Sequence, residues 1–134
     1  MNSDDVKALV EHRIKESHAA LADAEFLASS NRSPQSIINR AYYAMFYAVL
    51  ALLQLKGQVP GKHSGALGLF DRDFVQTDIF PREMSKHLHT AFERRQISDY
   101  QVVEPAGPEE TAEMLANARS FVEQVGKWLE SLKK

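Results

Sequence analysis

The residues best suited to hold an anion lie at the end of one predicted helix. By helical spacing, Arg95 continues the apolar stripe formed by Leu88 and Phe92, so its guanidinium is expected to point toward protein. Asp99 follows at the four-residue spacing at which two helical side chains meet, and Tyr100 adds a hydroxyl. Two interpretations stand: an Arg95–Asp99 ion pair that closes one end of the fold, or an arginine that binds an anion at a groove.

A second arginine precedes a stripe of aromatic residues in the predicted helix over residues 34–55. Arg40 is three residues before Tyr43 and seven before Tyr47, so all three share a face, and a guanidinium can stack on a tyrosine ring. The stripe consists of Tyr42, Tyr43, Phe46 and Tyr47. It suits a helical core and dimer interface, or a platform on which a nucleotide base stacks.

The third candidate is the start of a short predicted helix. Lys62, His63 and Ser64 directly precede it, and we expect Ser64 to cap it. The alternative is that the positive end of this helix holds a phosphate together with Lys62 and His63.

Several other chemistries find no support in the sequence. The phosphate-binding glycine motifs G-x-x-x-x-G-K and G-x-G-x-x-G are absent, as are the Glu-x-x-His pairs of helical di-metal proteins. His87 and His89 are two residues apart and point to different sides of a helix, so no metal site or other cofactor is expected.

These candidates need helices to position them, and four long segments have helical periodicity. A short connecting helix is predicted after Gly57, Pro60 and Gly61, where helical intervals separate His63, Leu67, Phe70 and Phe74. Asp78 is a candidate cap for the helix that follows Pro81. The long segments run from about Ser3 to Ser29, Pro34 to Leu55, Pro81 to Ser98 and Pro108 to Leu132. The predicted fold is an all-α, up-and-down four-helix bundle with an additional short connecting helix.

Size and composition fit one such bundle. The chain has 134 residues, 44% of them hydrophobic, which suits a single domain spanning residues 1–134. It contains no cysteine, so disulfides and thiolate metal sites are excluded. Because 16 basic residues stand against 18 acidic ones, any contact with nucleic acid must be local. The acidic start and the lack of a long apolar run predict a soluble, cytoplasmic protein with no membrane partner.

Three groups of residues, in this order and spacing, resemble a HEPN domain (higher eukaryotes and prokaryotes nucleotide-binding). They are Asn39-Arg40-Ala41-Tyr42-Tyr43-Ala44-Met45-Phe46-Tyr47-Ala48, then Lys62-His63-Ser64-Gly65 with Leu69-Phe70, and Arg95-Gln96-Ile97-Ser98-Asp99-Tyr100. The chain is most similar to the short stand-alone prokaryotic members, which are often encoded beside a minimal nucleotidyltransferase. The resemblance implies a four-helix bundle that forms a homodimer.

HEPN ribonucleases carry an arginine followed after four to six residues by a histidine, and two copies of this motif meet across the dimer to cleave RNA without metal. By position, Arg95 matches that arginine, but Tyr100 stands where the histidine would be. A tyrosine with an ordinary pKa of about 10 is a poor proton acceptor near neutrality. The resemblance therefore implies a protein that binds a nucleotide or RNA phosphate, or a nucleotidyltransferase partner, in a toxin–antitoxin or defence pair and without ribonuclease activity.

Two alternatives stay open. One is a metal-independent ribonuclease that uses Arg95 with Tyr100, or with His87. Arg82 and His87 have the literal motif spacing, as do Arg13 and His18, but positions five apart diverge by about 140° on a helix. The other alternative is a purely structural dimeric adaptor, in which Arg95 contacts no anion.

Overall fold

The computed structural model describes residues 3–100 and 106–133, and it describes the side chains of these residues except 97–100. Within these ranges every regular element is a helix, which confirms the predicted all-α class. The elements are α1 (Ser3–Ser29), α2 (Pro34–Leu55), α3 (His63–Phe70), the π-helical turn η1 (Asp71–Val75), α4 (Arg82–Tyr100) and α5 (Pro108–Ser131).

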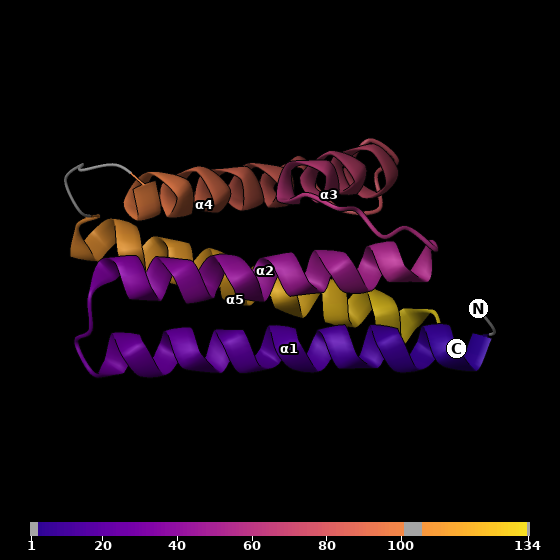
Figure 1. Ribbon diagram of the computed structural model, residues 1–134, viewed down its shortest axis with the longest axis horizontal. Coiled ribbons are helices and arrows are strands. Elements are labelled where there is room, and N and C mark those ends of the chain that lie inside the picture. The colour runs from indigo at the N-terminus through magenta and orange to yellow at the C-terminus, as the bar shows by residue number, and fades with distance from the viewer. Residues whose placement is uncertain (1–2, 101–105, 134) are drawn as a thin grey trace.

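The four long helices α1, α2, α4 and α5 alternate in direction along the bundle, as the up-and-down prediction requires (Figure 1). α1 lies on one side, α2 and α5 lie in the middle, and α4 with α3 covers the other side. α2 packs against α1, α3, α4 and α5, and its interface with α1 is the most extensive in the molecule. The helix with the most neighbours is thus the one whose sequence is almost entirely uncharged.

The ends of α2 are fixed by local sequence. The Ser33 side chain accepts a hydrogen bond from the Ser36 backbone N–H at 3.3 Å, and Pro34 occupies the first helical turn, where a missing N–H costs nothing. At the other end the chain leaves the helix through Gly57, whose φ of 74° lies in the left-handed region that glycine adopts without strain. Residues 34–55 therefore form one helix with defined ends.

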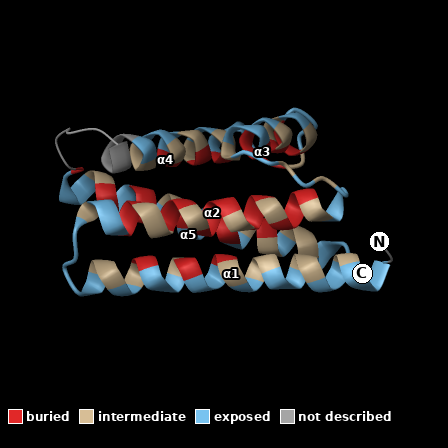
Figure 2. Ribbon diagram, viewed as in Figure 1, coloured by how far each residue is buried: buried red, intermediate tan, exposed pale blue. Residues whose placement is uncertain are grey.

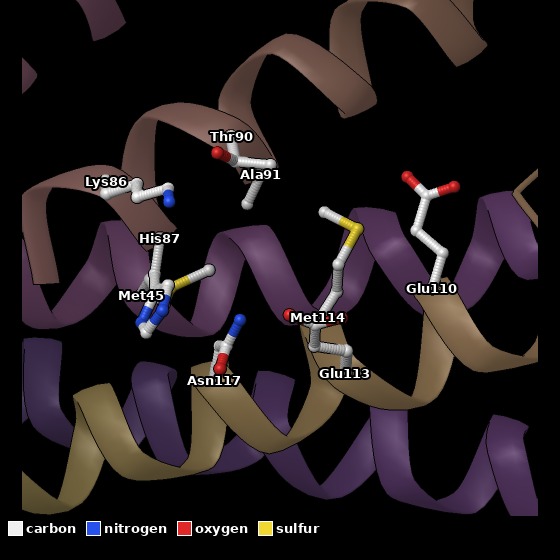
Figure 3. Close-up of a pocket in the computed structure, with 9 residues that line it drawn as sticks. All are labelled: Met45, Lys86, His87, Thr90, Ala91, Glu110, Glu113, Met114 and Asn117. Atoms are coloured by element: carbon white, nitrogen blue, oxygen red, sulfur yellow. The ribbon is translucent and has the colours of Figure 1, made fainter. Parts of the chain in front are cut away.

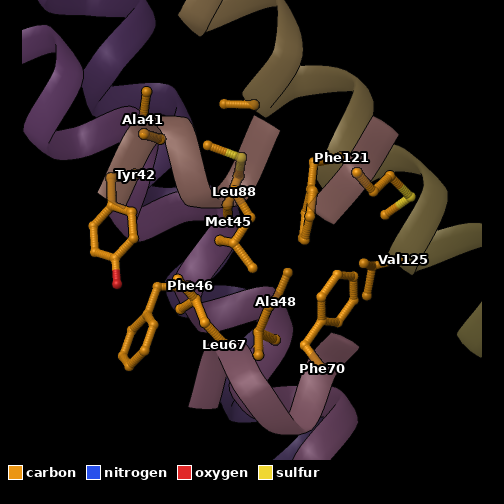
Figure 4. Close-up of a cluster of buried hydrophobic side chains, with 14 of the residues drawn as sticks. Ala41, Tyr42, Met45, Phe46, Ala48, Leu67, Phe70, Leu88, Phe121 and Val125 are labelled. Atoms are coloured by element: carbon orange, nitrogen blue, oxygen red, sulfur yellow. The ribbon is translucent and has the colours of Figure 1, made fainter. Parts of the chain in front are cut away.

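The hydrophobic core is built around α2. Figure 2 shows buried residues concentrated along this helix, and Figure 4 shows apolar side chains from α3, α4 and α5 meeting those of α2. The shared side chains include Met45, Ala48, Leu67, Phe70, Leu88 and Phe121. α2 is the one described helix with the length and hydropathy to cross a membrane, but 67% of its most apolar window is buried inside the bundle, as in a core helix.

The connection between α2 and α4 differs from the prediction in two details. The short helix continues past Phe70 to include Phe74, as the helical intervals predicted, but this last turn, η1, is π-helical, which no sequence signal indicated. Asp78 does not cap α4: it lies in the preceding turn with a φ of 62°, four residues before Arg82 begins the helix. Pro81 lies between that turn and α4. Its fixed φ suits a position just before or at a helix start.

Candidate functional site

Arg95 lies near the end of α4 and points inward, as predicted. Arg95 is half-buried, and its guanidinium carbon is 5.6 Å from the ring centre of Tyr42 and 5.3 Å from that of Tyr43. A cation at this distance from an aromatic face is attracted by about 0.5–1 kcal/mol at exposed sites and more when water is excluded. Tyrosine rings of α2 therefore hold the arginine.

Arg40 contacts the same tyrosine from α2 itself. Its guanidinium carbon is 5.1 Å from the Tyr43 ring centre, which confirms the predicted stacking, and its Nε donates to the neutral Asn39 side-chain oxygen at 3.2 Å. Tyr43 thus contacts one guanidinium group from α2 and one from α4. Both groups carry N–H donors and positive charge to the neighbourhood of one ring.

His63, the first residue of α3, completes the group. Its ring stacks on Phe46 with centres 4.0 Å apart, and its Nδ1 shares a 2.8 Å hydrogen bond with the Tyr42 hydroxyl. Partial burial, and then the positive charge of Arg95, lower the pKa of His63 below its usual 6.5. Near neutral pH the free imidazole is therefore mostly uncharged.

Tyr42 holds the His63 ring through the hydrogen bond of its hydroxyl. It is fully buried, and burial raises its pKa far above the usual 10 in spite of the opposing effect of Arg95. Its hydroxyl accordingly keeps its proton at any physiological pH.

We call Arg40, Tyr42, Tyr43, His63 and Arg95 the Arg95 patch. Apart from the buried Tyr42, each member is partly accessible, and the patch draws on α2, α3 and α4. It has an aromatic centre with two permanent positive charges and one imidazole, a composition suited to an anion joined to an aromatic ring.

α4 is held to its neighbour immediately before Arg95. The Arg94 guanidinium forms a two-bond contact with the Glu110 carboxylate of α5, with Nε and Nη2 at 2.7 and 2.9 Å from its two oxygens. This contact fixes the direction of the last described turns of α4, so Arg95 is presented to α2.

The structure brings together some of the candidate residues predicted from the sequence. Arg40, Tyr43, His63 and Arg95 are brought together, and Lys62 is exposed beside His63. The side chains of Asp99 and Tyr100 lie outside the described residues, so the expected Arg95–Asp99 pair stays a prediction.

The expectation that Ser64 caps α3 is wrong. The helix begins at His63, with Lys62 as its N-cap two residues before Ser64 and with no side-chain cap hydrogen bond. The start of α3 is instead positioned by His63, through its contacts with Tyr42 and Phe46.

Among the described residues, no hydrogen bond or ring contact joins either of the two literal arginine–histidine pairs. His87 lines a cavity of about 190 Å³ between α4 and α5, together with Lys86 and Asn117, and Arg82 does not line it (Figure 3). Arg13 pairs with Glu16 at 2.8 Å. His87 precedes Arg95 by eight residues, about 12 Å along the helix axis, so it belongs to a different part of the surface.

A cluster that the sequence did not indicate links η1 to α4. The Asp71 carboxylate accepts from the Ser85 hydroxyl at 2.6 Å, and its second oxygen is 2.7 Å from His89 Nε2. His89 therefore contacts η1 whereas His87 lines the cavity beside α5, on different sides of α4 as their spacing predicted. Ser85 and His89 are four residues apart on one face of α4, but their acceptor comes from another element that only the folded chain brings near.

Comparison with known proteins places these features in a family. A model of the HEPN domain matches residues 10–128. A protein of Thermotoga maritima named as a member of the UPF0332 group is 35% identical over 94% of this chain and 95% of its own length. Two proteins of Methanocaldococcus jannaschii carry the name putative toxin. One is 35% identical over 69% of this chain and 63% of its own length, and the other 28% identical over 96% and 92%. The chain belongs to the HEPN domain family.

Proposed function

We propose that this protein binds the phosphate group of a nucleotide or of RNA at the Arg95 patch and does not cleave it. The observation that carries the proposal is the placement of Arg40 and Arg95 over one tyrosine ring, with His63 beside them. Guanidinium groups match phosphate oxygens in geometry and charge, and an aromatic ring offers a surface on which a base stacks. Because the net charge of the chain is −2, attraction of a polyanion has to come from a local group of positive charges such as the Arg95 patch.

We further propose that the chain acts as a homodimer in a toxin–antitoxin or related defence pair, with a minimal nucleotidyltransferase as its partner. The relatives named as toxins support the toxin-like part of this proposal. Twofold symmetry would present two Arg95 patches, which doubles the number of phosphate contacts.

Cleavage is left out of the proposed function because Tyr100 stands where the family's ribonucleases have histidine. One observation favours cleavage as a second candidate: His63 places an imidazole beside Arg95, in a part of the chain remote from position 100 in sequence. An uncharged imidazole near neutral pH is suited to accept a proton. RNA that stays intact supports binding alone, whereas RNA that is cut by the wild type but not by Arg95→Ala supports cleavage.

The test is a binding titration with a labelled single-stranded RNA and with a nucleoside triphosphate. Removing one phosphate-binding guanidinium forfeits a charge-assisted hydrogen bond of about 1.5–3 kcal/mol, so Arg95→Ala and Arg40→Ala should each weaken binding about tenfold or more. Arg72→Ala is the matched control, since Arg72 is an exposed arginine whose described partner is its neighbour Asp73. If all three variants bind as the wild type does, the proposed site is wrong.

A further inference from the structure

The ring of His63 has one nitrogen in a hydrogen bond and one that reaches solvent. Nδ1 is occupied by the Tyr42 hydroxyl at 2.8 Å. Within the described part of the chain, no hydrogen bond engages Nε2, and Nε2 is not fully buried. Nε2 is therefore the accessible nitrogen of a ring that Phe46 clamps by stacking at 4.0 Å.

Tyr42 determines what Nε2 can do. Because the buried hydroxyl stays protonated, it donates to Nδ1 of the neutral ring, and the ring proton is then assigned to Nε2. If the ring gains a second proton, Nδ1 donates to the tyrosine oxygen and Nε2 remains a donor. In both charge states His63 offers an N–H on its accessible side, and the rigid aromatic packing fixes its direction.

The charged and titratable groups around His63 disfavour its protonation while the site is empty. α2 contributes Tyr42 and Tyr43, α4 contributes Arg95, and Lys62 precedes it in the chain. Among the described residues, no carboxylate forms an ion pair with His63. A ligand with two negative charges would reverse this balance, because it would favour the imidazolium and accept its Nε2–H bond.

We infer that His63 contacts the bound phosphate through Nε2–H and makes the Arg95 patch prefer a terminal phosphate monoester over the internal diester of a strand. This inference rests on the proposed function. A monoester has a second pKa of about 6 and carries nearly two charges at neutral pH, whereas a diester carries one. The patch supplies guanidinium N–H donors and a protonatable imidazole, and these groups attract a doubly charged monoester more strongly than a singly charged diester.

The matched pair of probes is one RNA sequence carrying either a 5′-phosphate or a 5′-hydroxyl, titrated into the protein by fluorescence anisotropy. One additional charge-assisted contact should make the phosphorylated strand bind about tenfold tighter. His63→Gln should reduce that ratio to about twofold or less, because glutamine cannot become charged. His18→Gln is the control, since His18 is exposed on α1, and it should leave the ratio unchanged.

The pH dependence provides a second readout. Above about pH 7 the monoester no longer titrates, so a preference that declines as pH rises reports loss of the proton on His63. Should His63→Gln fail to fold, as judged by its circular dichroism, nitrogen-15 NMR of the wild type answers the same question. Adding the 5′-phosphorylated strand should raise the pKa of His63 by about one unit.

The outcomes separate the inference from the proposed function. Equal affinity for both strands, with both weakened by Arg95→Ala, overturns the terminal-phosphate preference and keeps phosphate binding. A preference that His63→Gln does not change, or a His63 pKa that the phosphorylated strand does not move, also overturns the inference. Failure of either strand to bind removes the proposed function, and the inference with it.

Discussion

Replacing Asp71 by alanine should loosen the attachment of η1 to α4. Asp71 holds two side chains of α4, with Ser85 Oγ at 2.6 Å and His89 Nε2 at 2.7 Å from its carboxylate oxygens. Asp71 is 27% exposed and His89 42% exposed, so solvent weakens the second contact. Taking about 1–1.5 kcal/mol for the bond to Ser85 and about 0.5 kcal/mol for the exposed pair, we expect a loss of about 2 kcal/mol in the free energy of unfolding.

The assay is urea unfolding followed by circular dichroism, in a double-mutant cycle of Asp71→Ala with Ser85→Ala. If the two side chains interact as the structure places them, the double variant should be less destabilised than the sum of the single variants by about 1 kcal/mol. His89→Gln in a second cycle should give a smaller coupling, because that contact is more exposed. Additive effects in the Ser85 cycle would refute the reasoning. Because α3 and η1 are continuous, a loosened η1 should also weaken binding at His63.

Three further predictions concern the rest of the bundle. The hydrogen bonds from Arg94 lower the pKa of Glu110 below its usual 4.5. The ionised Glu110 therefore stabilises the fold above pH 4.5, and this stabilisation is lost as the pH falls through the lowered pKa of the folded protein. Glu110→Gln should accordingly lower the melting temperature at pH 7 and have little effect near pH 3, as thermal melts at the two pH values would detect. Ser17→Ala removes a buried 2.6 Å bond to the Ala44 carbonyl and should cost about 1–2 kcal/mol in urea unfolding, whereas an unchanged midpoint would contradict a contribution from this bond. Leu88→Ala empties a fully buried position between α4 and α2 and should cost about 2–5 kcal/mol, and a loss below about 1 kcal/mol would mean that the core closes over the gap.

The helices could be predicted from the sequence because their signals are local. Ser33 and Pro34 start α2 and Gly57 ends it, and all three act through residues close to them in the chain. The inward direction of Arg95 was predictable for the same reason, since it depends only on the spacing from Leu88 along one helix.

The partners across the fold were not predictable in this way. The bond between Tyr42 and His63 joins residues 21 apart and depends on how α3 docks on α2, which no periodicity encodes. The prediction of Ser64 as a cap was wrong because the aromatic contacts of His63 favour a helix start two residues earlier, a tertiary effect that outweighs capping preference. The Asp71 cluster depends on a π-helical turn, whose extra residue per turn rotates the side chains that follow.

The most direct test of the Arg95 patch is an NMR titration of the wild-type protein with a single-stranded RNA, monitoring the arginine Nε–H and histidine ring signals. Binding at the patch predicts that the largest shifts occur at Arg40, His63 and Arg95, and that Arg72 does not move. Shifts centred on His87, in the cavity between α4 and α5, or no shifts at all, would contradict the assignment of phosphate binding to the Arg95 patch.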